Sequence, residues 1–203
     1  MRESGLGKMA TKKRHTAGLV LFVMFGLLLA APARFGKPEE SAKPDFAAAR
    51  RDILQFEAAM NATINSSFSS SPFAVVNKAK GAYLEGHGFV FSFLINIHRA
   101  VKNTPFGVVR VGATVTQEMK RQRIEELKEK LIRLLQDNGE TLRMLRKEEY
   151  VTIIAYMEDR NFPDEPNENK TIVLSALKKD LDEFGHRSER LAEFKQRMKI
   201  VEY

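Results

Sequence analysis

Cysteine is absent from this chain of 203 residues. Its absence excludes disulfide bonds, thiol nucleophiles, metal sites built on cysteine and a lipid attached through cysteine. Burial of apolar side chains and hydrogen bonds must therefore hold the fold together.

Short motifs of catalysis and cofactor binding are lacking as well. We find no phosphate-binding G-x-x-x-x-G-K-[ST], no H-E-x-x-H, no G-x-S-x-G and no calcium-binding EF-hand loop. The one glycine-rich candidate, Gly86-His87-Gly88, leads into an expected strand rather than into a helix, so it does not fit a dinucleotide-binding turn. The sequence therefore predicts no cofactor. It also contains no internal repeat of the kind that would indicate a solenoid.

The N-terminal segment has the three parts of a secretory signal. Basic residues open the chain, an apolar run follows at 17–31, and Ala31-Pro32-Ala33 forms an A-x-A cleavage site. The run is shorter than the roughly 20 residues that span a bilayer. We therefore expect a signal peptide at 1–33 and a periplasmic location after cleavage. The alternative is an uncleaved segment that anchors the protein in the inner membrane.

Most of the net charge of +7 belongs to this segment. Residues 34–203 contain 28 basic and 25 acidic side chains, a balance of +3. Because a nucleic-acid binder concentrates positive charge on one surface, we expect no nucleic-acid partner. Contact with a membrane is expected only through an uncleaved leader or a weak surface interaction.

Periodicity divides the remainder into a linker at 34–44 and one domain at 45–203. Asp45 is placed to cap a helix over 46–64, whose apolar residues recur every three or four positions from Phe46. A second helix is expected at 116–138, with Thr114 and Gln117 at capping-box spacing and Asn138-Gly139 as a left-handed stop.

Alternation with a period of two predicts strands. The strongest covers Phe89 to His98, and a weaker one at 73–84 precedes it across the turn Glu85–Gly88. Two more strands are expected at 150–157, central in its sheet, and at 171–177. A third helix then carries apolar residues at helical spacing: Leu181, Phe184, Leu191, Phe194 and Met198.

The resulting order is α-β-β-α-β-β-α. It predicts an α+β fold with a mainly antiparallel sheet of about four strands and helices packed on one face. Residues 99–115 are ambiguous between a loop and an interrupted strand, because Pro105 and Gly107 fall inside them.

Two groups of residues are candidates for chemistry. Glu85 and His87, in the predicted turn, would serve as acid and base of a hydrolase-type enzyme. Five carboxylates in an expected surface loop offer oxygen ligands to calcium, although we prefer solubility and charge pairing as the explanation of such a loop. These are Glu158, Asp159, Asp164, Glu165 and Glu168.

Three segments carry a resemblance: 82–91 (AYLEGHGFVF), 151–154 (VTII), and 171–175 (TIVLS) before Lys178–Leu181. Over about 75–184 the chain resembles a group of exported bacterial proteins of uncharacterised activity. That resemblance implies export and no particular reaction.

Taken together, these features predict an exported envelope protein that binds or assembles rather than catalyses. A protein partner, or a second copy docking on the third helix and the tail from Leu191 to Tyr203, is the expected contact. A periplasmic hydrolase with its site near Glu85–Gly88 is the alternative.

Overall fold

The computed structural model describes residues 45–67, 74–98, 101–110, 114–159 and 167–203, which all belong to one compact unit. The predicted signal peptide and linker lie outside these ranges. Within the described ranges, no helix has the length and apolarity that crossing a membrane requires.

Two long helices form as the sequence predicts. α1 (Phe46–Ser67) begins at Asp45, whose carboxylate accepts hydrogen bonds from the N–H groups of Ala47 and Ala48, each at 3.0 Å. Its buried face includes Phe56, Met60 and Ile64, whereas Phe46, expected on that face, is exposed.

α2 (Gln117–Asn138) differs from expectation at both ends. Its cap is Thr116, not Thr114, and the Thr116 hydroxyl accepts from Met119 N at 3.2 Å. The left-handed stop is wrong, because Gly139 has φ −66° and continues into the 3₁₀ turn η1 (Gly139–Thr141). A Cβ at Gly139 would lie 2.6 Å from Leu181, so close packing accounts for the glycine.

The main sheet is mixed and has five strands. β1 (Ala74–Leu84), β2 (Gly88–Asn96), β5 (Tyr150–Glu158), β6 (Lys170–Leu177) and β7 (Lys199–Glu202) lie in the order β1-β2-β5-β6-β7. The β1–β2 hairpin and the central place of β5 are confirmed, and β5 and β6 pair antiparallel. The expected count of four strands is too low, and β2 pairs with β5 in parallel.

A second, two-stranded sheet occupies the ambiguous segment. β3 (Val101–Thr104) and β4 (Gly107–Arg110) pair as an antiparallel hairpin. Together with α2, this hairpin makes up the long connection that a parallel β2–β5 pair requires.

The predicted third helix is wrong beyond Phe184. α3 (Lys178–Phe184) ends before His186, which has a positive φ of 53°, and the turn η2 (Ser188–Arg190) leads to α4 (Leu191–Arg197). The chain then forms β7. Leu181, Phe184, Phe194 and Met198 are still buried, because both short helices turn an apolar side to the same core.

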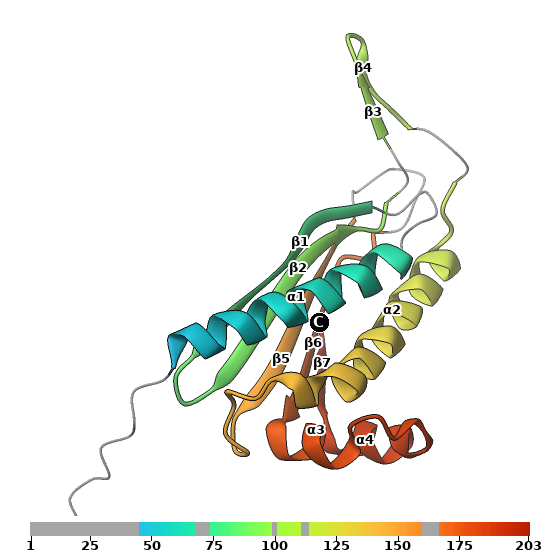
Figure 1. Ribbon diagram of the computed structural model, residues 1–203. Coiled ribbons are helices and arrows are strands. Elements are labelled where there is room, and N and C mark those ends of the chain that lie inside the picture. The colour runs from blue at the N-terminus through green and yellow to red at the C-terminus, as the bar shows by residue number, and fades with distance from the viewer. Residues whose placement is uncertain (1–44, 68–73, 99–100, 111–113, 160–166) are drawn as a thin grey trace, which may run out of the picture. The chain divides into compact units, whose positions relative to one another are not determined.

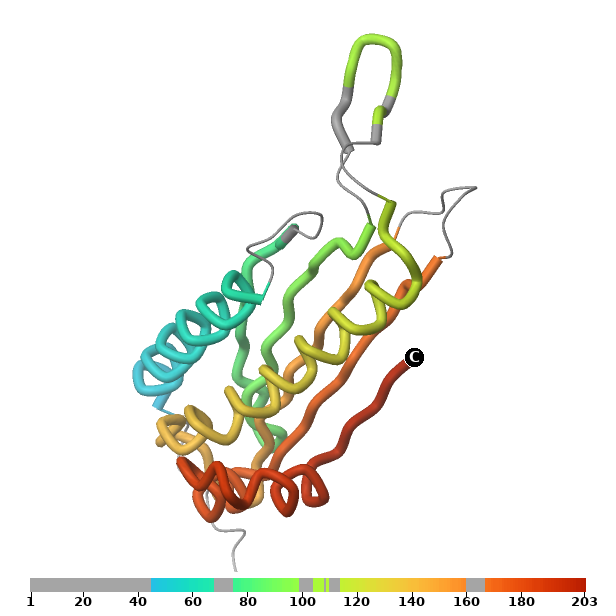
Figure 2. The backbone as a smooth tube through the Cα atoms, turned by 90° about the vertical axis from the view of Figure 1, so that its right-hand side faces the viewer, coloured from blue at the N-terminus to red at the C-terminus, as the bar shows by residue number. Residues whose placement is uncertain are grey.

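α1 and α2 cover one face of the sheet, and α3 and α4 lie at its end (Figures 1 and 2). Phe89, Phe91, Phe93 and Ile95 of β2 point to the helices and are buried. α1 also closes the outer edge of β1. Glu57 Oε1 and Asn61 Oδ1 accept hydrogen bonds from the N–H groups of Gly81 and Ala79, both at 2.8 Å.

Candidate functional site

The sheet face opposite α1 and α2 is covered by none of the described elements; we call it the open face. Strand register places its side chains in rows that cross the sheet. One row consists of Asn77, Leu94, Tyr156, Thr171 and Tyr203. The next consists of Lys80, Ser92, Ile154, Val173 and Val201.

A groove of about 930 Å³ lies over the first row and over Lys80 and Ser92 of the second. Tyr156 and Tyr203 line it and are 44% and 73% exposed, and Leu94 contributes an aliphatic surface between β1 and β5. Amide and hydroxyl groups of Asn77, Ser92, Asn169 and Thr171 also line it. An accessible apolar groove with a few polar groups is the usual form of a binding site.

Positive charge borders this face. Lys78 and Lys80 line the groove from β1, and Lys199 lies on β7 at the opposite edge of the sheet, where it pairs with Ser175 of β6. Lys80 is 79% exposed and lies 3.5 Å from Glu57, a weak pair. Glu158 is the one acidic side chain of the groove lining among the described residues. The centre of the face is therefore apolar and hydroxyl-bearing, with lysines at both edges.

The predicted acid–base pair lies at the other end of the open face and is not assembled. Both Glu85 and His87 are exposed in the β1–β2 turn, and no hydrogen bond or ion pair joins these two described residues. His87 instead stacks on Tyr150, with 5.8 Å between ring centroids. Its Nε2 lies 3.3 Å from the hydroxyl of Thr152, which lies 3.0 Å from that of Ser175.

Next to this turn, Glu149 directly precedes β5 and anchors the start of that strand through hydrogen bonds. Its carboxylate accepts from the Arg146 N–H at 2.8 Å, the Arg146 guanidinium at 2.9 Å and the Tyr83 hydroxyl at 3.0 Å. Burial alone would raise the pKa of Glu149, but these hydrogen bonds outweigh burial and hold it below its usual value. The same burial, together with the bond to Glu149, raises the pKa of Tyr83. This cluster fixes the chain beside the turn.

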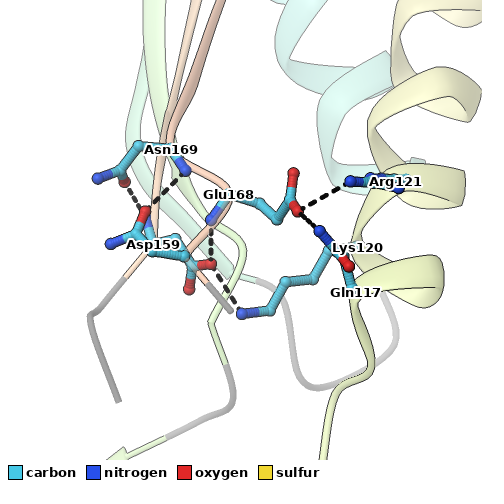
Figure 3. Close-up of polar contacts among 7 residues, drawn as sticks. Gln117, Lys120, Arg121, Asp159, Glu168 and Asn169 are labelled. Carbon is cyan, nitrogen blue, oxygen red and sulfur yellow. Dashed lines mark hydrogen bonds and ion pairs between the residues drawn. The ribbon is translucent and has the colours of Figure 1, made fainter. Parts of the chain in front are cut away.

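The predicted acidic loop is partly an ion-pair network with α2 (Figure 3). Asp159 is buried, in contrast to the expected surface position, and accepts from Lys120 Nζ at 2.7 Å and from Glu168 N at 2.8 Å. Glu168 accepts from Gln117 and pairs with Arg121 at 3.4 Å.

These contacts bear on the calcium hypothesis. Asp159 and Glu168 already pair with Lys120 and Arg121. Glu158 lines the groove instead. The remaining two carboxylates, Asp164 and Glu165, lie outside the described residues. Within the ranges that the structure describes, no three histidine or carboxylate side chains form a group that could hold a metal. His98, at the end of the strand predicted from the sequence, is buried just after β2.

The groove residues were missed from the sequence. On β5, Tyr156 lines the groove and alternates with Thr152 and Ile154 on the open face. Because the residues between them are also apolar, the sequence pattern of this strand is that of a strand buried on both sides. The sequence signal that could have revealed the open face is the presence of Thr152 and Tyr156 among the aliphatic residues of this central strand.

No protein-family model, curated protein or solved structure matches this chain, so the groove and its rows of side chains carry the functional argument alone.

Proposed function

We propose that this protein is an exported, non-catalytic binding module of the cell envelope, and that its open face binds a segment of another protein. The observation that carries the proposal is the groove of about 930 Å³ on a sheet face that no described element covers. Exposed aromatic side chains such as Tyr156 and Tyr203 are typical anchors of protein interfaces.

Charge complementarity indicates the chemistry of the partner. Lys78 and Lys199 border the face from opposite edges and form no ion pair with a described residue. A segment with apolar side chains for the centre of the face and carboxylates for these lysines satisfies both features. The proposed location follows from the N-terminal segment, with cleavage after Ala33 and retention in the periplasm.

Site-specific photo-crosslinking in cells tests the binding surface. A photoreactive amino acid replaces Tyr156 on the open face and, as a control, Arg133 on the exposed side of α2. We expect a discrete protein adduct from position 156 only. Adducts of equal yield from both positions, or none from position 156, would refute the open face as the site. Intact mass of the recovered chain shows whether residues 1–33 have been removed.

Charge reversal in the same background tests the chemistry of the partner. Lys78→Glu together with Lys199→Glu should lower the yield of the adduct about tenfold, because like charges then face each other. Lys179→Glu on α3 is the matched control and should leave the yield unchanged. An unchanged yield from the double variant would refute an acidic partner while leaving the binding surface in place.

A hydrolase is the second candidate function, and the contact between His87 and Thr152 is the observation that favours it. A hydroxyl within hydrogen-bond reach of a histidine is the first requirement for an activated nucleophile. His87→Ala separates the two functions. An enzyme would lose turnover of an ester or amide substrate while remaining folded, whereas the binding module would keep its adduct at position 156.

A further inference from the structure

The β3–β4 hairpin presents a large apolar side chain entirely to solvent. Phe106, at its tip, is 100% exposed, the highest value among the large apolar side chains of the described residues. Val109, on β4, is 51% exposed. Full exposure of a phenylalanine costs free energy that contact with an apolar phase would recover.

The tip has a defined conformation. The Thr104 hydroxyl donates to the Gly107 carbonyl at 2.8 Å and accepts from Phe106 N at 3.3 Å. Pro105 restricts its own φ, and Gly107 has a positive φ of 117° that favours glycine. These contacts hold Phe106 at the end of the turn.

The hairpin is also cationic. Residues 101–110 contain Lys102 and Arg110 and no acidic residue. Lys102 pairs with Val109 and Arg110 with Val101, so both cations occupy strand positions about 10 Å or more from the tip at ordinary strand rise. An interfacial segment buries its apolar part about 5–10 Å into the boundary between headgroups and acyl chains.

We propose that the β3–β4 hairpin binds an anionic membrane surface, with Phe106 entering the interface and the positive charge of residues 101–110 favouring anionic lipid. An aromatic tip followed by cations is the arrangement that lipid interfaces favour. A pocket on a protein partner would take Phe106 without requiring charge of one sign along the whole hairpin. This membrane contact goes beyond the proposed function, since it uses neither the open face nor the groove.

A single tryptophan tests the insertion directly, because the chain contains none. Phe106→Trp and the control Leu54→Trp, at a position 55% exposed on α1, are prepared in the chain as recovered from the cell envelope. Vesicles of phosphatidylglycerol with phosphatidylcholine should shift the emission of the Phe106→Trp protein to the blue and allow quenching by brominated lipid. The Leu54→Trp protein should show neither effect, even if the leader adsorbs to the vesicle.

The role of charge is tested in the Phe106→Trp background. Lys102→Gln with Arg110→Gln should weaken partitioning about 30-fold, as two interfacial cations are lost. Three results would overturn the proposal: no shift on anionic vesicles, an equal shift on pure phosphatidylcholine, or the same shift from both tryptophans. A shift caused by envelope proteins but not by vesicles would assign the tip to a protein partner instead. Circular dichroism of each variant confirms that the fold is intact.

Discussion

Among single residues, Lys120 and Asp159 form the contact with the greatest consequence for stability. Both side chains are completely buried, and Asp159 Oδ1, although shielded from water, has no hydrogen-bond partner among the described residues. Removing one partner of a buried pair leaves the other charge without compensation. The pair joins the start of α2 to the end of β5, two segments 39 residues apart.

We therefore expect Lys120→Met to lower the free energy of unfolding by about 3–5 kcal/mol. Arg121→Met is the matched control, because Arg121 is 58% exposed in its pair with Glu168 and should contribute no more than about 1 kcal/mol. Urea denaturation of both variants measures the difference. Equal costs would show that burial of the Lys120 pair does not matter.

Glu149 predicts a dependence of stability on pH. Since its pKa is lower in the folded chain, its contribution is complete above the unfolded value near about 4.3 and is lost as the pH falls through the folded value. Glu149→Gln should therefore be less stable than the unaltered protein at about pH 7, and the gap should narrow below about pH 4. Denaturant titrations across this range test the sign; a gap that widens in acid would contradict it.

At the scale of elements, the β1–β2 turn depends on two glycines in different ways. Gly86 and Gly88 both have positive φ, 77° and 116°, but only Gly88 lies against another strand. A Cβ at Gly88 would lie 2.1 Å from the carbonyl oxygen of Tyr150 on β5, whereas a Cβ at Gly86 has no atom within 4 Å.

Gly86→Ala should cost about 1–2 kcal/mol through its backbone conformation alone. Gly88→Ala should cost more, about 3 kcal/mol or above, because β5 must also move away from β2. Thermal unfolding of the two variants makes the comparison. Equal losses of stability in the two variants would mean that the β5 backbone at Tyr150 can move away from β2 without an energetic penalty.

The elements that could be predicted from the sequence are those whose signals are local. The Asp45 cap, the apolar period of α1 and the glycine turn between β1 and β2 each lie within a few residues of what they determine. The prediction of one continuous third helix was wrong because the apolar residues keep a helical spacing across the interruption at His186. These residues are Leu181, Phe184, Leu191 and Phe194. Lys199–Glu202 is too short to show alternation, and it is a strand because β6 pairs with it.

The candidate site was less predictable than the fold. The parallel pairing of β2 with β5 brings Leu94 beside Tyr156, and no local pattern contains that pairing. In the same way, the sequence does not distinguish Asp159 from the other carboxylates of the loop, because its partner Lys120 is 39 residues away on α2. Glu85 and His87 share a turn, as expected, but a shared turn does not orient two exposed side chains toward each other.

At the scale of the whole molecule, one core runs from α1 to α4. The rings of Phe56 on α1 and Phe91 of β2 are tilted by 39° with 4.7 Å between their centroids, and those of Phe184 and Phe194 lie 5.9 Å apart near the end of the sheet. All four rings are buried in the same apolar cluster.

Phe56→Ala and Phe194→Ala should each lower the free energy of unfolding by about 3–5 kcal/mol, and each should leave a single transition. Tyrosine fluorescence and far-ultraviolet circular dichroism should therefore report the same midpoint in each variant. Separate midpoints would show that α3, α4 and β7 unfold independently of the remainder.

Because Glu57 and Asn61 of α1 cover the outer edge of β1, the order of synthesis decides when that edge can be shielded. α1 precedes β1 in the sequence, so the side chains that occupy the N–H groups of Ala79 and Gly81 are synthesised before the strand that needs them. An edge strand left open invites pairing with other chains. The partner of β2 on its other side, β5, emerges more than 50 residues later, after the hairpin and α2. During that interval α1 is already available to shield the outer edge of β1, so the unfinished β1–β2 hairpin has one open edge, at β2, instead of two.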